Sequence, residues 1–175
     1  MRLRQPIAAA NDAESGDLNQ RNSLGFAGLE TYRGAVYPWH CDHMGHMNVM
    51  WYVGKFDEAT WNLFAAIGLT PTFLRAQNRG MAAVQQNISY RRELNAGDVV
   101  VVRSAILEVR DKVVRFVHEM RNVESGEIAA LCELTGVHLD TAARKSCPFP
   151  AAVLSEARAR IQSYDLTPPP GRNPT

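Results

Sequence analysis

The sequence predicts an α+β domain in which one long helix packs against a mainly antiparallel sheet of five strands. Apolar residues recur at spacings of three and four from Val49 to Ile67, which is the pattern of an amphipathic helix. Four later segments are rich in apolar and β-branched residues and are separated by short polar turns. Strands joined by such turns pair antiparallel, so we expect a sheet with one face covered by the helix.

The length and composition are those of a single folded domain. A chain of 175 residues is too short for two ordinary domains. Its hydrophobic share of 46% and charged share of 21% argue against wholesale disorder. Residues 1–28 are polar without an apolar period and predict a flexible N-terminal arm. Residues 165–175 form a proline-rich tail, which leaves residues 29–164 for the domain.

Charge and cysteine content exclude several classes of protein. The net charge of +1 provides no field that would concentrate nucleic acid on the surface. Three cysteines without a CxxC spacing suggest neither a disulfide framework nor a zinc knuckle. No apolar run approaches the ~20 residues that span a bilayer, and the N-terminal apolar stretch is too short for a secretory signal. We therefore expect a cytoplasmic protein with no membrane partner.

The elements are expected in a definite order. A strand over residues 31–39 gives way to a loop, because Pro38 cannot continue a paired strand. The long helix begins at Val49 and stops before Gly68, which suits a left-handed C-terminal position. Strands follow over residues 81–94, 98–110, 112–122 and 127–140, and a short surface helix over residues 149–164. The apolar stripe of the long helix consists of Val49, Tyr52, Val53, Phe56, Ala59, Leu63, Phe64 and Ile67.

The loop before the long helix, WHCDHMGHMN over residues 39–48, is the candidate site. Asp42 lies just ahead of the helix N-terminus, whose unpaired N–H groups favour a nearby anion. Asn48 suits an N-cap, and Gly45 suits a positive φ in the turn. The amides of Asn48, Val49 and Met50 could stabilise an oxygen that becomes negative during attack on a carbonyl group.

The segment VYPWHCDHMGHMNVMWYVGKFDEAT, residues 36–60, resembles the opening of hot-dog-fold acyl-CoA thioesterases of the 4-hydroxybenzoyl-CoA thioesterase-like type. Those proteins open with a strand, an Asp-x-x-Gly-His-(Val/Met)-Asn loop and a central helix. The resemblance continues through YRRELNAGDVVVVRSAILEV and TGVHLDTAARKSCPFP, and covers roughly residues 31–150. The sequence departs from the family pattern at His40, where an acidic or hydroxyl residue is common, and at Val49, where a second Asn is frequent.

This resemblance implies a hot-dog fold and an acyl-CoA thioesterase. It implies that Asp42 either attacks the thioester as a nucleophile or activates water as a general base, with no metal or organic cofactor. We expect a homodimer or a dimer of dimers, which would also protect the edge strands. The residues expected near the acyl-CoA substrate are His40, His46, Trp51, Glu58, Arg91 and Arg92, the arginines through phosphate groups.

Alternatives remain open at this point. His40, His43 and His46 with Cys41 and Asp42 offer zinc ligands, although a loop containing Gly45 does not present them on one helix face. Glu58 is the second choice of base, because another branch of hot-dog thioesterases uses a carboxylate on the helix. His40 or His46 with Glu58 could also serve a hydratase or dehydratase. A non-catalytic module that binds an acyl ligand is the remaining candidate.

Overall fold

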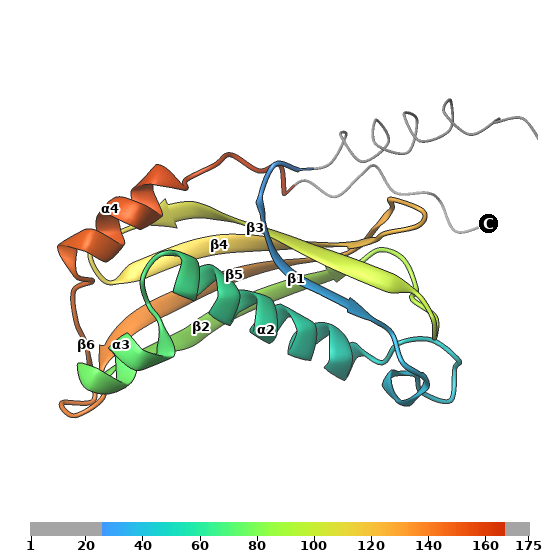
Figure 1. Cartoon of the computed structure of the whole chain (residues 1–175), viewed down its shortest axis with the longest axis horizontal. Coiled ribbons are helices and arrows are strands. Elements are labelled where there is room, and N and C mark those ends of the chain that lie inside the picture. Colours follow the sequence, from blue (N-terminus) through green and yellow to red (C-terminus); the bar gives the residue numbers. More distant parts are fainter. Residues whose placement is uncertain (1–25, 167–175) are drawn as a thin grey trace, which may run out of the picture.

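The computed structural model describes residues 26–166, and it has the hot-dog architecture. The long helix α2 (Val49–Ala66) lies along one face of a curved antiparallel sheet (Figure 1). The strand order is β1-β3-β4-β5-β2, and β6 extends the sheet beside β5. The strands are β1 (Leu29–Ala35), β2 (Arg79–Tyr90), β3 (Val99–Val109), β4 (Val113–Asn122), β5 (Ile128–Asp140) and β6 (Lys145–Ser146). The α+β class, the central helix and the five main strands confirm the prediction.

The expected N-terminal arm and proline-rich tail lie largely outside the described residues, which begin at 26 and end at 166. Within this range, no helix is both long and apolar enough to cross a membrane. The C-terminal helix α4 (Ala151–Ala159) is shorter than predicted. The first strand also ends early, at Ala35, because Pro38 opens a 3-10 turn, η2 (Pro38–His40), instead of closing the strand.

One further helix was not predicted. Helix α3 (Pro71–Ala76) has Pro71 in its first turn, where the missing N–H costs nothing, and Thr70 as its N-cap. The Thr70 hydroxyl accepts a hydrogen bond from the Phe73 amide at 3.2 Å. Its six residues are too few to show a helical period in the sequence.

The apolar stripe of α2 was assigned correctly except at its start. Val49 and Val53 are 56% and 41% exposed, and Lys55 is buried instead. The Lys55 ammonium donates hydrogen bonds to the Tyr32 hydroxyl at 2.8 Å and to the Ala35 carbonyl at 3.3 Å. Strand β1 thus covers the Lys55 side of α2. Val49 and Val53 face a groove between α2 and β2, the opposite edge strand.

A chain of hydrogen bonds crosses the core between α2 and the sheet. The Thr60 hydroxyl donates to the Phe56 carbonyl at 2.9 Å, so it accepts from His118 Nε2, also at 2.9 Å. His118 Nδ1 must then accept from the Ser104 hydroxyl at 2.5 Å. This assignment requires a neutral imidazole. Complete burial agrees with it, because it lowers the pKa of His118 to about 3.

Candidate active site

The loop that carries Asp42 is folded back on itself at the start of α2. Gly45 adopts a φ of +90°, as expected, and lets the chain reverse direction. The Gly45 amide donates to the Asp42 carbonyl at 3.0 Å, and the Asp42 amide donates to the His46 carbonyl at 3.2 Å. The Met47 amide bonds the Leu94 carbonyl at 2.7 Å and ties the loop to the segment that follows β2. The position of Asp42 is therefore fixed by backbone hydrogen bonds on both sides.

The Asp42 carboxylate accepts two hydrogen bonds that fix its direction. Its Oδ1 accepts from the Met44 amide at 2.9 Å, and its Oδ2 accepts from the Asn48 side-chain amide at 3.0 Å. These bonds hold the pKa of the Asp42 carboxyl below its usual value, the Asn48 bond first and the Met44 bond second. The carboxylate is ionised at neutral pH.

Asn48 has two roles at the start of α2. Its Oδ1 accepts a hydrogen bond from the Met50 amide at 3.0 Å, which confirms the predicted N-cap. Its Nδ2 donates to Asp42, a contact that the sequence did not reveal. One side chain therefore couples the helix N-terminus to the carboxylate.

The amides at the start of α2 are not all available to stabilise a negative oxygen, contrary to what was expected from the sequence. The Asn48 amide donates to the His40 carbonyl at 2.9 Å, and the Met50 amide is used by the N-cap. Neither is free to bind a negative oxygen, so these two candidates were wrong. The Val49 amide has no acceptor among residues 26–166. It is the donor that the helix N-terminus leaves available.

A pocket of about 310 Å³ opens beside Asp42. Five residues named from the sequence lie in its wall: Asp42, His46, Val49, Arg91 and Arg92. Met47, from the loop before α2, also lines it. The remaining lining residues were not expected here, because they come from the interior of α2 and from the end of β2, which only the folded chain brings together. They are Tyr52, Tyr90 and Glu93.

Tyr52 supports the far wall of this pocket. Its hydroxyl donates to the Arg92 carbonyl at 3.2 Å, and its ring meets that of Tyr90 edge to face at 5.2 Å. Burial raises the pKa of Tyr52 to about 12, so the phenol stays protonated and keeps this hydrogen bond at neutral pH. The Arg92 guanidinium at the rim pairs with Glu127 at 3.2 Å.

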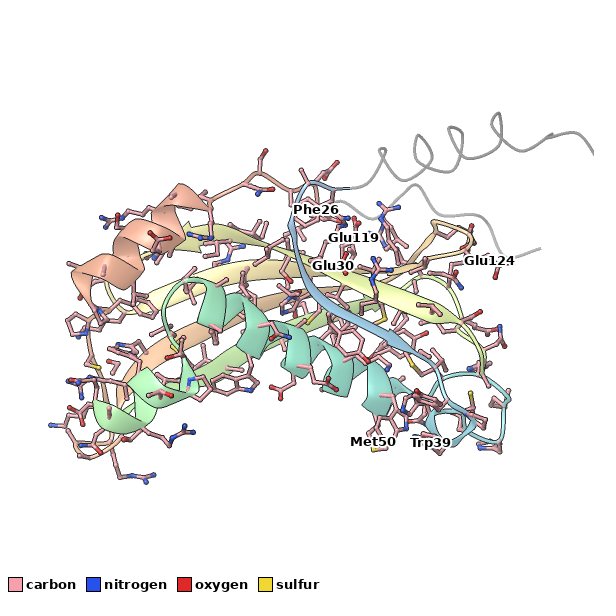
Figure 2. All side chains as sticks on the ribbon, in the orientation of Figure 1. Phe26, Glu30, Trp39, Met50, Glu119 and Glu124 are labelled. Atoms are coloured by element: carbon pink, nitrogen blue, oxygen red, sulfur yellow. The ribbon has the colours of Figure 1, made fainter. Side chains whose placement is uncertain are left out.

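The remaining predicted site residues do not line this pocket. His40 is buried, its Nδ1 accepts from the Tyr37 amide at 3.1 Å, and its ring lies 4.3 Å from that of Trp51. Burial, together with the charge of Lys55, lowers the pKa of His40. His40 and Trp51 thus pack the junction of η2 and α2. Met50 projects from the start of α2 away from the sheet (Figure 2).

His46 and Glu58 have charged partners other than Asp42. His46 lies 3.4 Å from Glu93, and the side chain that donates a hydrogen bond to Asp42 is that of Asn48. Glu58 is exposed on the helix face that also carries Lys55, and its charge acts on His40. Among the described residues, no group of three His, Cys, Asp or Glu side chains is arranged to hold a metal ion.

A curved antiparallel sheet around one long helix is the hot-dog fold. The chain belongs to the Thioesterase-like superfamily, whose family model matches residues 36–157.

Named relatives agree with this assignment. A betainyl-CoA thioesterase of Pseudomonas aeruginosa is 28% identical over 142 residues, which are 81% of this chain and 89% of that protein. An Agrobacterium fabrum L-carnitine dehydrogenase/betainyl-CoA thioesterase is 32% identical over 65% of this chain, a match that spans 23% of that longer protein.

Solved structures share the fold. A Staphylococcus aureus protein in complex with CoA superposes with a TM-score of 0.74 at 18% identity, over 82% of this chain and 92% of that one. A 1,4-dihydroxy-2-naphthoyl-CoA thioesterase from Synechocystis gives a TM-score of 0.66 at 18% identity, over 74% and 95% of the two chains.

Proposed function

We propose that this protein hydrolyses acyl-CoA thioesters at the pocket beside Asp42. Water adds to the thioester carbonyl carbon, the carbon–sulfur bond breaks, and the products are a carboxylic acid and the CoA thiol. The observation that carries the proposal is the pairing of two groups in one pocket. The Asp42 carboxylate is ionised and held in one orientation, and the Val49 amide lacks an acceptor among the described residues.

The two groups would divide the reaction between them. Asp42 attacks the carbonyl carbon to form a mixed anhydride, or it removes a proton from the attacking water. The Val49 amide donates a hydrogen bond to the carbonyl oxygen as that oxygen becomes negative. The positive end of the α2 dipole stabilises the same charge. Because the amide is fixed by the helix, no reorganisation is needed when the charge appears.

The rim of the pocket suits the CoA part of the substrate. Arg91 and Arg92 follow β2 and lie on the pocket wall, where their guanidinium groups would meet phosphate oxygens. The Glu127 carboxylate accepts from the Nε of Arg92, and other N–H groups of this guanidinium stay available for a phosphate oxygen.

A homodimer would complete this architecture. Strand β2 is an edge of the sheet and is twelve residues long. It carries the exposed Val84, and the neighbouring helix exposes Val53 and Trp61. A long apolar edge of this kind invites pairing with another strand. We propose that β2 pairs with β2 of a second copy, which would place the open side of the α2–β2 groove against that copy.

The rival chemistry has less support. A hydratase or dehydratase needs a histidine and a carboxylate that converge on a carbon-bound proton next to the thioester. His40 is buried against Trp51, and Glu58 lies outside the Asp42 pocket. His46 and Glu93 both line the Asp42 pocket and could still serve such chemistry. The experiment therefore distinguishes thioester hydrolysis from hydration.

The test is release of free thiol from a panel of acyl-CoA esters by the purified protein. Thioester hydrolysis liberates one thiol for each ester consumed. Hydration changes the acyl group and liberates none, while a binding module retains the ester unchanged. Absence of thiol release across short, branched, aromatic and cationic acyl groups would contradict the proposal.

A further inference from the structure

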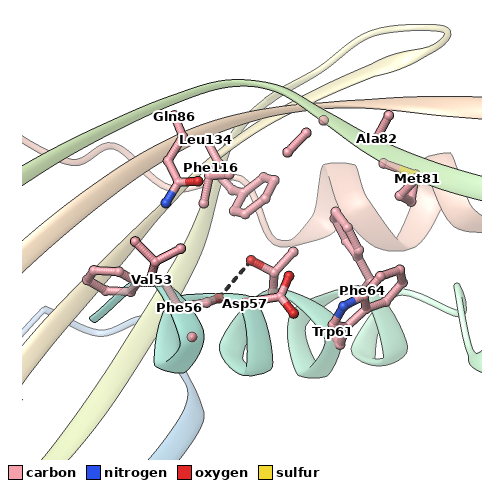
Figure 3. A pocket seen from close by; sticks show the side chains of 14 residues that line it. Val53, Phe56, Asp57, Trp61, Phe64, Met81, Ala82, Gln86, Phe116 and Leu134 are labelled. Atoms are coloured by element: carbon pink, nitrogen blue, oxygen red, sulfur yellow. Dashed lines mark hydrogen bonds between the residues drawn. The ribbon is translucent and has the colours of Figure 1, made fainter. Parts of the chain in front are cut away.

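A second cavity lies between α2 and β2, further along the helix than the Asp42 pocket (Figure 3). Its volume is about 220 Å³. The rings of Trp61, Phe64 and Phe116 and the thioether of Met81 make its walls largely apolar. Among the described residues, Asp57 is the one charged residue that lines it, and Figure 3 shows the Asp57 carboxylate rising from α2 on the side of the cavity.

The two pockets lie along the same stripe of α2 and the same side of β2. Val49 lines the first and Val53 and Asp57 line the second, and spacings of four place all three on one stripe of the helix. On the opposite wall, Tyr90 and Gln86 face the same side of β2 because four residues separate them. The helical rise of 1.5 Å per residue sets Asp57 about 12 Å along α2 from Val49. An acyl group whose carbonyl lies at Val49 would therefore extend toward Asp57.

Asp57 is not neutralised by the protein. Within residues 26–166, no ion pair or hydrogen bond reaches its side chain, and no cationic residue lines the cavity. Glu58, next to it in sequence, points to the Lys55 face of the helix and does not line the cavity. A carboxylate beside an apolar chamber repels anionic acyl groups and gains nothing from neutral ones. It attracts a cation.

The aromatic walls select the kind of cation. Phe64 meets Trp61 and Phe116 edge to face, with ring centroids 6.0 and 5.4 Å apart. Ring faces attract quaternary ammonium groups, whose methyl shell also suits apolar surroundings. A primary ammonium would lose strong hydration here and needs several acceptors. The Thr60 hydroxyl already donates to Phe56, which leaves Asp57 and Gln86 as the main polar groups.

We propose that this cavity binds a trimethylammonium group at the end of the acyl chain, with Asp57 as counter-ion and Trp61 as an aromatic contact. The proposal rests on thioester hydrolysis at Asp42 and names the class of acyl group that is cleaved there. Asp57 selects the substrate and takes no part in bond breaking.

Matched pairs of esters test this selectivity. 6-Trimethylammoniohexanoyl-CoA and 8-trimethylammoniooctanoyl-CoA, whose acyl chains are long enough to extend from Val49 toward Asp57, are each compared with the ester in which carbon replaces the quaternary nitrogen. Shape and volume are the same within each pair, and only the charge differs. We expect kcat/KM to favour the cationic member of at least one pair by about tenfold or more, as a cation held by a ring and a carboxylate requires.

The variant Asp57→Asn should bring this ratio close to one by raising KM for the cationic ester, with the carbon ester cleaved as before. Glu58→Gln is the matched control and should leave the ratio unchanged. Non-hydrolysable thioether analogues of the same esters should bind with the same preference for the cationic member of a pair, measured as a ratio of dissociation constants by calorimetry. This measurement does not depend on whether any ester is cleaved.

Two results would overturn the proposal. One is an equal preference within both pairs, in kinetics and in binding, for the wild-type protein. The other is an Asp57→Asn variant that loses activity equally on cationic and carbon esters, because that would place Asp57 in catalysis or assembly. By contrast, analogue binding with the expected charge preference but no thiol release from any ester would contradict the proposed hydrolysis and leave the cation site supported.

Discussion

The Val49 amide can be removed without disturbing the helix that carries it. Val49 is the first residue of α2, a position where proline is favoured because its N–H has no partner inside the helix. Asn48 has φ −67° and ψ 146°, which is the backbone conformation that a residue before proline adopts. Val49→Pro therefore deletes one hydrogen-bond donor at the pocket and keeps both the backbone path and the N-cap.

The size of the effect follows from what the amide touches. It has no acceptor among the described residues, and the Val49 side chain is 56% exposed, so the substitution breaks no described hydrogen bond and removes little buried surface. Thermal stability should therefore stay close to that of the wild type. Loss of one oxyanion donor typically lowers kcat by about 10²- to 10³-fold. Because this bond strengthens as charge develops, KM should change much less.

The assay is steady-state thiol release with Val49→Ala as the matched control. The alanine variant also shortens the side chain but keeps the N–H, and it should retain most of the activity. If the folded proline variant turned over at a rate near that of the alanine variant, the amide would not stabilise the oxyanion. The division of roles between Asp42 and the helix N-terminus would then be wrong.

Three further predictions address the rest of the molecule. Asn48→Ser keeps an N-cap but removes the hydrogen-bond donor to Asp42, so the pKa of that carboxyl should rise toward its usual value. The acid limb of the kcat/KM profile should then move to higher pH. An unchanged profile would exclude Asn48 as a positioning residue. His118 is neutral and buried, and its pKa is lowered from 6.5 to about 3. Its contribution to stability is therefore complete above the pKa of the unfolded chain, near 6.5, and is lost as pH falls from there toward 3. The free energy of unfolding should drop by about 1.4 kcal/mol per pH unit in that window, and His118→Asn, although less stable at neutral pH, should lose this part of the slope in denaturant titrations. Val84→Lys places a charge on the exposed edge strand β2 and should shift a dimer toward monomers in sedimentation velocity, whereas unchanged mass would locate the contact elsewhere.

Much of the fold was predictable because it depends on local periodicity. The 3.6-residue period of α2 and the alternation in β3 to β5 are properties of short segments, and the turns between them are marked by Gly97 and Gly126, both with positive φ. Burial of Lys55 was not predictable, since it depends on the Tyr32 hydroxyl and the Ala35 carbonyl of a strand about twenty residues away.

The site was predictable only where chain position determines chemistry. Asp42 and Asn48 were identified because they precede a helix, and both lie where that argument places them. The Asn48 and Met50 amides were misjudged, because their use by His40 and by the cap depends on how the loop closes. The choice between neighbouring carboxylates on α2 was also beyond the sequence. One residue turns a helix by about 100°, which sends Asp57 to the groove and Glu58 to another face.

The most direct test of the account is the rate of thiol release by Asp42→Asn, measured beside Asp111→Asn, a control in the exposed turn between β3 and β4. Asparagine preserves the size of the side chain but can neither attack the thioester nor accept a proton. We expect kcat to fall by about 10²-fold or more with CoA binding retained, while the control matches the wild type. An Asp42→Asn variant that hydrolyses its best ester at a near-normal rate would contradict the central claim.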